Sequence, residues 1–311
     1  MIAILGAGGS IANHLVSLLS SSQESFRLVS RSARPDPRAA QVLSADLTRL
    51  DQAVEAVAGC GTVYLVAGLK YDHKVWAEVW PRIMSNVIEA CKRAGARLLF
   101  FDNVYMYGRV SGAMTEQTPF NPVSRKGEIR ARIATSLMRE WESGSLTAMI
   151  ARAADFYGPS TPTALPSVMV FAPLCRGQRA SWLVNDAVPH SFTFTPDAAK
   201  GLVTLAAHES AWNQTWHLPT TPPPPTGREF IEMAAEALGT NPRYRVLSKP
   251  MVRVFGWFQP IVGEVYEMLY QNDSPYIFDT SKYATAFGFA GTPYREGIRA
   301  TAESFRAEKT G

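Results

Sequence analysis

The feature that most constrains the fold of this sequence is its beginning, where the apolar run IAIL (2–5) leads into GAGGSIA (6–12) and then into a helical pattern. An apolar run followed by glycines and an amphipathic stripe is typical of a buried strand that turns tightly into a helix. Similar apolar runs alternate with helical patterns through the first half of the chain, at RLVS (27–30), TVYLVA (62–67), RLLFF (97–101) and TAMIARA (147–153). This alternation predicts an α/β protein with a parallel sheet covered by helices on both faces.

The regular alternation ends near residue 155, where prolines become frequent. Strand patterns return at SFTFT (191–195) and TWHL (215–218), and TGRE (226–229) has the form of a capping box before a helix that ends at Gly239. A capping pair is also expected at Thr48 and Asp51. We therefore expect two domains. The larger comprises residues 1–160, completed by 190–218, and the smaller comprises 161–189 and 219–311.

Composition argues against several classes of function. The 311 residues carry a formal net charge of only +4, spread along the chain, which gives little support for a nucleic-acid partner. The three cysteines and five histidines show no disulfide or metal-ligand spacing, so we expect no metal site and a cytoplasmic location. We find no signal-peptide pattern, and we expect the stretch 251–270 to be a buried or lid-forming segment and not a membrane span. We expect a small-molecule substrate, and the sequence leaves open whether the chain forms a homodimer.

The glycine-rich turn has the spacing of a dinucleotide-binding loop. Gly6 and Gly9 would permit a tight turn and a close approach of the backbone to a pyrophosphate, and the following helix would offer N–H groups at its N-terminus. The alternative is a plain turn between strand and helix. The predicted cofactor contacts in this loop are Gly6, Gly8, Gly9, Ser10 and Ile11.

The residue that follows the second strand bears on the form of the cofactor. Arginine suits a phosphorylated ribose, whereas an acidic residue suits the unphosphorylated one, and this chain has Arg31 there. The sequence therefore favours NADP over NAD, with a solvated basic loop as the alternative. Further on, Asp46 either contacts an adenine edge or simply precedes the next helix, and the sequence does not separate these two interpretations.

Taken together, these segments resemble the extended short-chain dehydrogenase/reductases, also called NAD-dependent epimerase/dehydratases. GAGGSIA is similar to the family's GxxGxxG loop with Ala12 in place of the last glycine, and ADL (45–47) is similar to the adenine-contacting GDL. Further similar segments are VYLVAG (63–68), DFYGP (155–159), FTFTPDAAKG (192–201) and DTSKYATAFG (279–288). The resemblance implies a Rossmann-type doubly wound parallel sheet with a smaller C-terminal substrate domain, and a nicotinamide cofactor. The further cofactor contacts that it implies are Asp46, Leu47, Val66, Ala67, Gly68 and Lys126.

The chain departs from this family at the residues of the proton relay. Family members carry YxxxK, in which the tyrosine donates the proton and the lysine lowers its pKa and holds the nicotinamide ribose. Here the lysine is kept as Lys126, but Pro122 occupies the position of the tyrosine. Asn103 stands where relatives place Ser or Thr. The usual relay therefore does not transfer to this chain, which resembles an atypical branch.

The segment DNVYMYG (102–108) supplies the best local replacement for the lost tyrosine. A phenol can give or take a proton, and a neighbouring Lys126 ammonium would lower its pKa, whereas an asparagine amide can only polarise a carbonyl. In an extended segment, Asn103 and Tyr105 would project to the same side at the carboxyl end of a parallel strand. The alternative for the tyrosines is core packing with satisfied hydroxyl groups. We predict Asn103, Tyr105 and Lys126 as catalytic residues, and Tyr71, Tyr107 and Arg152 as substrate contacts.

These residues favour an NAD(P)-dependent oxidoreductase that acts on a small carbonyl or alcohol compound by hydride transfer. Two alternatives stay open. One is an epimerase or dehydratase of the nucleotide-sugar type that retains its cofactor, and the other is a non-catalytic NADP-binding sensor or partner-binding protein. Downstream aromatic residues, among them Trp182, Phe192, Trp257 and Phe258, either line an apolar substrate cavity or pack the core.

Overall fold

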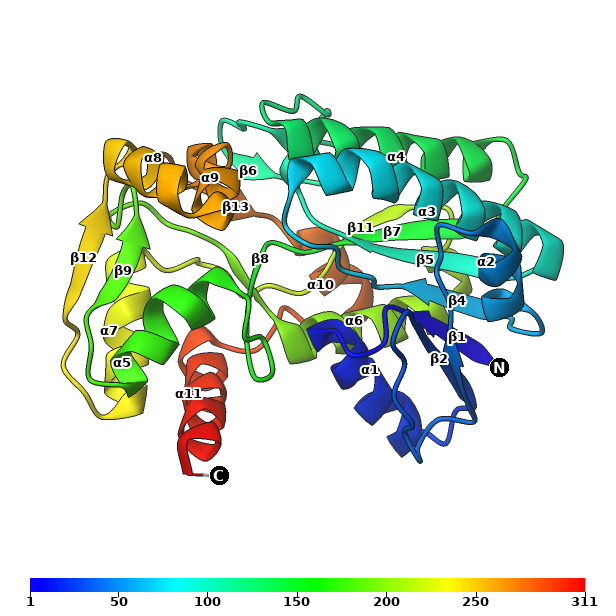
Figure 1. Cartoon of the computed structure of the whole chain (residues 1–311), viewed down its shortest axis with the longest axis horizontal. Coiled ribbons are helices and arrows are strands. Elements are labelled where there is room, and N and C mark those ends of the chain that lie inside the picture. Colours follow the sequence, from blue (N-terminus) through cyan, green and yellow to red (C-terminus); the bar gives the residue numbers. More distant parts are fainter. Residues whose placement is uncertain (311) are drawn as a thin grey trace. The chain divides into compact units, whose positions relative to one another are not determined.

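A seven-stranded sheet forms the centre of the larger part of the molecule (Figure 1). The computed structural model describes residues 1–310 of the chain. The strand order is β11-β7-β5-β4-β1-β2-β3, and the pairs from β3 across to β7 are parallel. The strands are β1 (Ile2–Leu5), β2 (Phe26–Ser30), β3 (Gln41–Ser44), β4 (Thr62–Leu65), β5 (Arg97–Asp102), β7 (Ala148–Arg152) and β11 (Thr215–His217). The predicted fold class, a Rossmann-type doubly wound parallel sheet, is confirmed.

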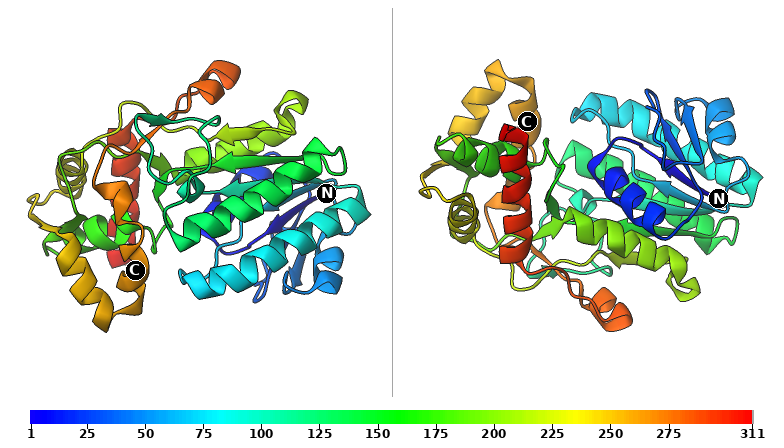
Figure 2. Two further views of the ribbon diagram at one scale, coloured as in Figure 1. Left: turned by 90° about the horizontal axis from the view of Figure 1, so that it is seen from above. Right: turned by 90° about the horizontal axis from the view of Figure 1, so that it is seen from below.

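Helices cover both faces of this sheet. On one face lie α1 (Ser10–Ser21) and α6 (Thr195–Ala207), and on the other lie α2 (Leu50–Val57), α3 (His73–Ala94) and α4 (Arg125–Glu142), as the views from above and below show (Figure 2). The chain runs outward from β1 to β2 and β3, then returns to β4 on the other side of β1. The strand order therefore reverses between β1 and β4, and open α/β sheets bind ligands at such a point.

The helix boundaries follow from local capping groups. Asp72 is the N-cap of α3 and accepts hydrogen bonds from the backbone N–H groups of Lys74 and Val75, while Gly95 ends the helix in the left-handed conformation. Thr226 and Glu229 form the predicted capping box of α7 (Gly227–Leu238). The capping pair predicted at Thr48 is wrong, because the N-cap of α2 is Arg49 and makes no side-chain hydrogen bond.

The chain packs as two compact units. Unit 1 contains the sheet and comprises residues 1–108, 120–152 and 198–216. Unit 2 comprises residues 109–119, 153–197 and the chain from His217 onward. The assignment of cofactor binding to one part of the chain and substrate binding to the other stays a prediction.

Unit 2 is built from three short parallel strand pairs and several helices. The strand pairs are β8 (Asp155–Tyr157) with β10 (Phe192–Phe194), β9 (Ala180–Leu183) with β12 (Tyr244–Leu247), and β6 (Ala113–Met114) with β13 (Ile277–Phe278). Besides α7, the helices are α5 (Ala172–Cys175), α8 (Lys249–Phe258), α9 (Pro260–Tyr266), α10 (Ser281–Phe287) and α11 (Tyr294–Thr310). Aromatic side chains dominate its core, among them Tyr157, Phe171, Trp182, Phe192 and Phe230.

The stretch 251–270 forms the helix pair α8 and α9. The expectation that this stretch is buried is wrong for two of its largest side chains, because Trp257 and Phe258 are 74% and 79% exposed. None of the described helices is long and apolar enough to cross a membrane.

Candidate active site in unit 1

The turn after β1 lies where the strand order reverses. Gly6 has φ +117°, and a Cβ atom placed on it would lie 2.6 Å from the backbone N and Cα atoms of Ala67, which follows β4. The N–H of Val66 donates to the carbonyl of Leu5 at 2.9 Å. Only glycine fits this position, because any side chain would meet fixed backbone. The loops that follow β1 and β4 are therefore held together at the ligand-binding edge of the sheet.

Helix α1 begins directly after this turn with an N-terminus suited to an anion. Its N-cap, Gly9, offers no side chain to the first turn, and that turn contains no acidic residue. The N-terminal end of a helix dipole is positive, so this arrangement favours a phosphate. The predicted contacts Gly6, Gly8, Gly9, Ser10 and Ile11 lie together on this turn, and their binding role stays a prediction.

Asp46 shapes the loop that precedes α2. Its carboxylate accepts hydrogen bonds from the N–H of Thr48 at 3.0 Å and from the Thr48 hydroxyl at 2.8 Å. These bonds lower the pKa of Asp46, and the charge of Arg31 lowers it further. The next residue, Leu47, is buried, and its carbonyl accepts a hydrogen bond from Asn86. These contacts agree with the interpretation that Asp46 orders the loop before α2. Its contact with an adenine edge stays a prediction.

The segment after β5 does not continue as extended backbone. β5 ends at Asp102, and Tyr105–Tyr107 form a 3₁₀ helix, η1. The side-chain oxygen of Asn103 accepts a hydrogen bond from the N–H of Tyr105 at 3.1 Å. The expected alternation that would point Asn103 and Tyr105 to one side is therefore wrong, because asparagine closes a local turn with its own backbone.

Lys126 lies over the ring of Tyr71, one of the predicted phenols. Its side chain is 0% exposed, and its Nζ lies 4.5 Å from the centroid of the Tyr71 ring. The Tyr71 hydroxyl donates to the Tyr105 hydroxyl across 3.4 Å. The fold thus brings together Tyr71, Tyr105 and Lys126 from three separate segments. A phenol hydroxyl can give or take a proton, so this group offers two adjacent hydroxyls for proton transfer.

Trp76 and Arg130 fix the positions of these phenols. The ring of Trp76 stacks on Tyr105 at 6.3 Å and meets Tyr71 edge-on at 5.6 Å. The guanidinium carbon of Arg130 lies 4.6 Å from the centroid of Trp76. Arg130 follows Lys126 by one helical turn on α4, so the two cations share a face of that helix. Sequence reasoning missed both residues, although the spacing between Lys126 and Arg130 is a visible signal.

Tyr107 and Arg152 lie in a buried charge cluster. The Arg152 guanidinium donates to the Tyr107 hydroxyl at 2.6 Å, and the two side chains are 1% and 0% exposed. Asp102 accepts a hydrogen bond from Arg130 at 3.1 Å and lies 4.0 Å from Arg152. Burial raises the pKa of Asp102, while the two guanidinium groups favour its ionised form. The predicted substrate contacts Tyr107 and Arg152 are thus engaged with each other inside the protein, and a role toward substrate stays a prediction.

Gly127 sets the position of Lys126. A Cβ atom on Gly127 would lie 2.6 Å from the carbonyl oxygen of Tyr105, so the first turn of α4 packs directly on η1. The hydroxyl of Ser124 caps α4 by accepting from the N–H of Gly127 at 3.0 Å. A larger residue at 127 would push the lysine away from the phenols.

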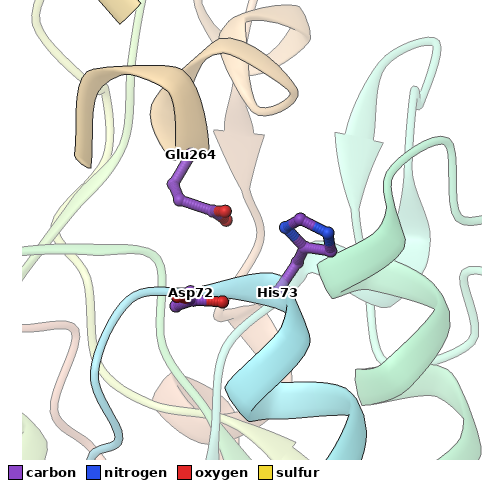
Figure 3. A group of neighbouring side chains, drawn as sticks. All are labelled: Asp72, His73 and Glu264. Atoms are coloured by element: carbon purple, nitrogen blue, oxygen red, sulfur yellow. The ribbon is translucent and has the colours of Figure 1, made fainter. Parts of the chain in front are cut away.

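The side chains of Asp72 and His73 lie at the start of α3 (Figure 3). Both already have other partners. Asp72 Oδ1 caps α3, and His73 Nε2 lies 2.9 Å from an Arg125 nitrogen. A guanidinium next to the ring disfavours a second cation. We therefore assign no metal role to these residues.

A comparison with protein-family models gives a match over most of the chain. A model of the NAD dependent epimerase/dehydratase family matches residues 2–217. No curated protein sequence matches the chain.

Solved structures resemble the whole chain. MoeE5 in complex with UDP-glucose and NAD is 23% identical, with 99% of each chain covered and a TM-score of 0.79. A DesIV double mutant from Streptomyces venezuelae, a dTDP-glucose 4,6-dehydratase, is 17% identical over 100% of this chain and 98% of that chain, with a TM-score of 0.82. UDP-glucuronic acid 4-epimerase from Bacillus cereus is 16% identical over 98% of each chain, with a TM-score of 0.80. These likenesses support the fold, and the family match, which covers most of the chain, confirms the resemblance noted in the sequence: this protein belongs to the NAD dependent epimerase/dehydratase family of enzymes.

Proposed function

We propose that this protein is an enzyme of the epimerase/dehydratase type that holds a nicotinamide dinucleotide at the turn between β1 and α1. The observation that carries the proposal is the Gly6 turn, packed against Ala67 at the reversal of strand order and followed by the uncapped start of α1. The family match supports the same conclusion. In this type of enzyme the hydride taken from the substrate is returned within one catalytic cycle.

When bound, the nicotinamide ring supplies the hydride chemistry. The chain must supply a group that takes and returns the proton of the substrate oxygen. With Pro122 in the place of the usual tyrosine, the hydroxyl groups of Tyr71 and Tyr105 are the candidates, because they lie 3.4 Å apart and the Tyr71 ring contacts Lys126. The lysine charge would stabilise the phenolate that forms when either hydroxyl gives up its proton.

The proposal also concerns which dinucleotide is bound, NAD or NADP. MoeE5 and the B. cereus epimerase are both described in complex with NAD, which favours NAD. The exposed Arg31 after β2 supports NADP, since a guanidinium can bind the extra phosphate. Because Arg31 belongs to this chain itself, we propose NADP as its cofactor.

A sugar nucleotide is the substrate class that the comparisons support. MoeE5 is described with UDP-glucose and with UDP-glucuronic acid. The second candidate is a reductase or dehydrogenase of a small carbonyl or alcohol compound. It would use the same bound nicotinamide and the same phenol hydroxyls, so the site of unit 1 is compatible with either reaction.

The test begins with the full-length purified protein. Denaturation followed by mass spectrometry of the supernatant should release about one dinucleotide per chain if the cofactor is retained, as expected for an epimerase or dehydratase. Incubation with UDP-glucose, UDP-glucuronic acid or dTDP-glucose should then give a new sugar signal in proton NMR without net consumption of added cofactor. Stoichiometric NADPH oxidation with a panel of carbonyl compounds would instead support the second candidate. Absence of any dinucleotide binding would refute both.

A further inference from the structure

Helices α8 and α9 of unit 2 carry most of the exposed apolar surface of the described chain. Twelve large apolar side chains are exposed there, and seven of these lie between Met251 and Tyr266. Trp257 and Phe258 are the most exposed of all twelve. Soluble proteins rarely gather large apolar side chains at one place on the surface unless that place contacts a partner.

The exposed side chains of α8 follow the helical repeat. Met251, Val254, Phe255 and Phe258 have the spacing i, i+3, i+4 and i+7, so they form one continuous stripe. A different face of the helix attaches it to unit 2, because Val252 is only 1% exposed and packs in a small apolar cluster. The helix is therefore apolar both toward the protein and toward solvent, and packing within unit 2 does not account for the outer stripe.

The two helices form a firmly held hairpin, which we call the α8–α9 hairpin (Figure 1). A Cβ atom on Gly256 would lie 3.0 Å from the Cα atom of Gly263, so the two backbones cross in direct contact. At the start of α8, the Lys249 ammonium lies 2.6 Å from a carboxylate oxygen of Asp273. The exposed aromatic pair precedes the turn between the helices and is thus presented on a fixed backbone.

The chain around this hairpin is strongly basic. Residues 240–263 contain no acidic residue and four cationic ones, which are Arg243, Arg245, Lys249 and Arg253. The formal net charge of the whole protein is also +4, so the rest of the chain is balanced. The three arginines are exposed and form no ion pair with any described residue. Their charge is therefore available to an external anionic group.

This charge discriminates between the partners that could cover the apolar surface. A second copy bound through the same surface would bring two basic segments together, and like charges repel. A membrane that contains anionic lipids has the opposite charge. Its interfacial region also accommodates exposed tryptophan and phenylalanine side chains beside arginine and lysine.

We propose that the α8–α9 hairpin docks this protein onto the surface of membranes that contain anionic lipids. Trp257, Phe258 and the apolar stripe of α8 enter the interfacial region, while the arginines bind lipid headgroups. The contact is peripheral and requires no helix that crosses the membrane. The inference goes beyond the proposed function, because it concerns a surface of unit 2 and requires neither dinucleotide nor turnover.

The experiment sediments the full-length protein with vesicles of phosphatidylcholine alone and with vesicles that also contain about 30% phosphatidylserine. We expect at least tenfold stronger binding to the anionic vesicles, and we expect high salt to weaken it. Analytical ultracentrifugation of the same protein without lipid tests the rival partner. Absence of binding to the anionic vesicles would overturn the proposal, as would self-association that depends on Trp257 and Phe258.

Matched variants locate the contact. The double variant Trp257→Ser, Phe258→Ser removes exposed side chains only and should weaken vesicle binding by about tenfold or more, whereas Leu18→Ser, at an exposed position of unit 1, should not.

Arg253→Gln should weaken binding by about fivefold, whereas Arg299→Gln, at an exposed arginine on α11, should leave it unchanged. Equal binding by wild type and the aromatic double variant would contradict the assignment. Vesicle binding by a protein that binds no dinucleotide would leave this inference standing while the proposed function fails.

Discussion

The Nζ atom of Lys126 lies 4.5 Å from the centroid of the Tyr71 ring, and the Tyr71 hydroxyl lies 3.4 Å from that of Tyr105. The lysine is on α4, whereas the two tyrosines follow β4 and β5. The segments after these neighbouring strands therefore supply a pair of phenols, one of which contacts the buried lysine. We propose this pair as the substitute for the tyrosine that Pro122 replaces.

The first prediction concerns these two phenols. If one of them handles the substrate proton, its replacement by phenylalanine should lower kcat by about 10²–10⁴-fold and change KM little. Steady-state kinetics of Tyr71→Phe, Tyr105→Phe and the double variant, on the substrate that turnover assays identify, assign the role. Tyr266→Phe, at a tyrosine that is 38% exposed, serves as the control and should keep full activity. Undiminished turnover in the double variant would show that neither phenol is the proton donor.

The second prediction concerns the ribose end of the cofactor. Arg31→Asp should weaken NADP binding by about tenfold or more relative to NAD, because a carboxylate repels the 2′-phosphate and accepts hydrogen bonds from a free ribose. Calorimetric titration of the cofactor-free protein with each dinucleotide gives the ratio. Arg34→Asp, in the same exposed loop, controls for a general change in surface charge. An unchanged ratio in Arg31→Asp would mean that Arg31 does not contact the phosphate.

The third prediction tests the glycine turn. Gly6→Ala should lower the free energy of unfolding by about 2–4 kcal/mol, because the new Cβ would meet the Ala67 backbone and the residue has positive φ. It should also weaken dinucleotide binding. Gly61→Ala is the matched control, since its Cβ would have no neighbour within 4 Å. Chemical denaturation of the three proteins gives the comparison, and equal midpoints would contradict the crowding at Gly6.

The sequence predicted the parts of this fold that depend on local patterns. IAIL became β1 with the same bounds, and the TGRE capping box formed as expected. Each of these signals is contained within four consecutive residues. The edge strand β3 was not predicted, because its residues are only partly buried and form no apolar run. The expected extended path after Asp102 was wrong, because Asn103 binds the N–H of Tyr105.

The candidate site was predictable only in part for a similar reason. Lys126 and Tyr105 could be chosen from their motifs, but the contact between Lys126 and Tyr71 depends on the packing of α4 against η1. The pairing of Asp102 with Arg130 joins a strand end to a helix face. No local pattern encodes such long-range contacts.

The fourth prediction concerns pH. The hydrogen bonds from Thr48 hold the pKa of Asp46 below its ordinary value of 3.8. Folding therefore favours the carboxylate, so this contribution to stability is present above pH 3.8 and is lost as the pH falls through the lower folded value. Thr48→Val removes one of the two hydrogen bonds and should raise the pKa of Asp46. An NMR titration of the carboxyl carbons measures it, with Asp51 as an internal reference that should not change. An unaltered Asp46 pKa in the variant would contradict the assigned cause.

The fifth prediction separates a structural role of Tyr107 from a role in substrate binding. The Tyr107 hydroxyl accepts the 2.6 Å hydrogen bond of Arg152, whose Nε and second terminal nitrogen are buried and make no hydrogen bond to the described residues. Tyr107→Phe leaves this guanidinium with one partner fewer and should lower the free energy of unfolding by about 1–3 kcal/mol.

Because Tyr107 and Arg152 are almost fully buried, we expect kcat and KM of Tyr107→Phe to stay within about twofold of the wild type at a temperature where the variant is folded. Thermal unfolding and kinetics on the same preparation test both parts. The exposed Tyr266→Phe should change neither quantity. A large rise in KM without loss of stability would instead mean that the Tyr107 hydroxyl meets the substrate during turnover, and that the charge cluster around Asp102 opens to admit it.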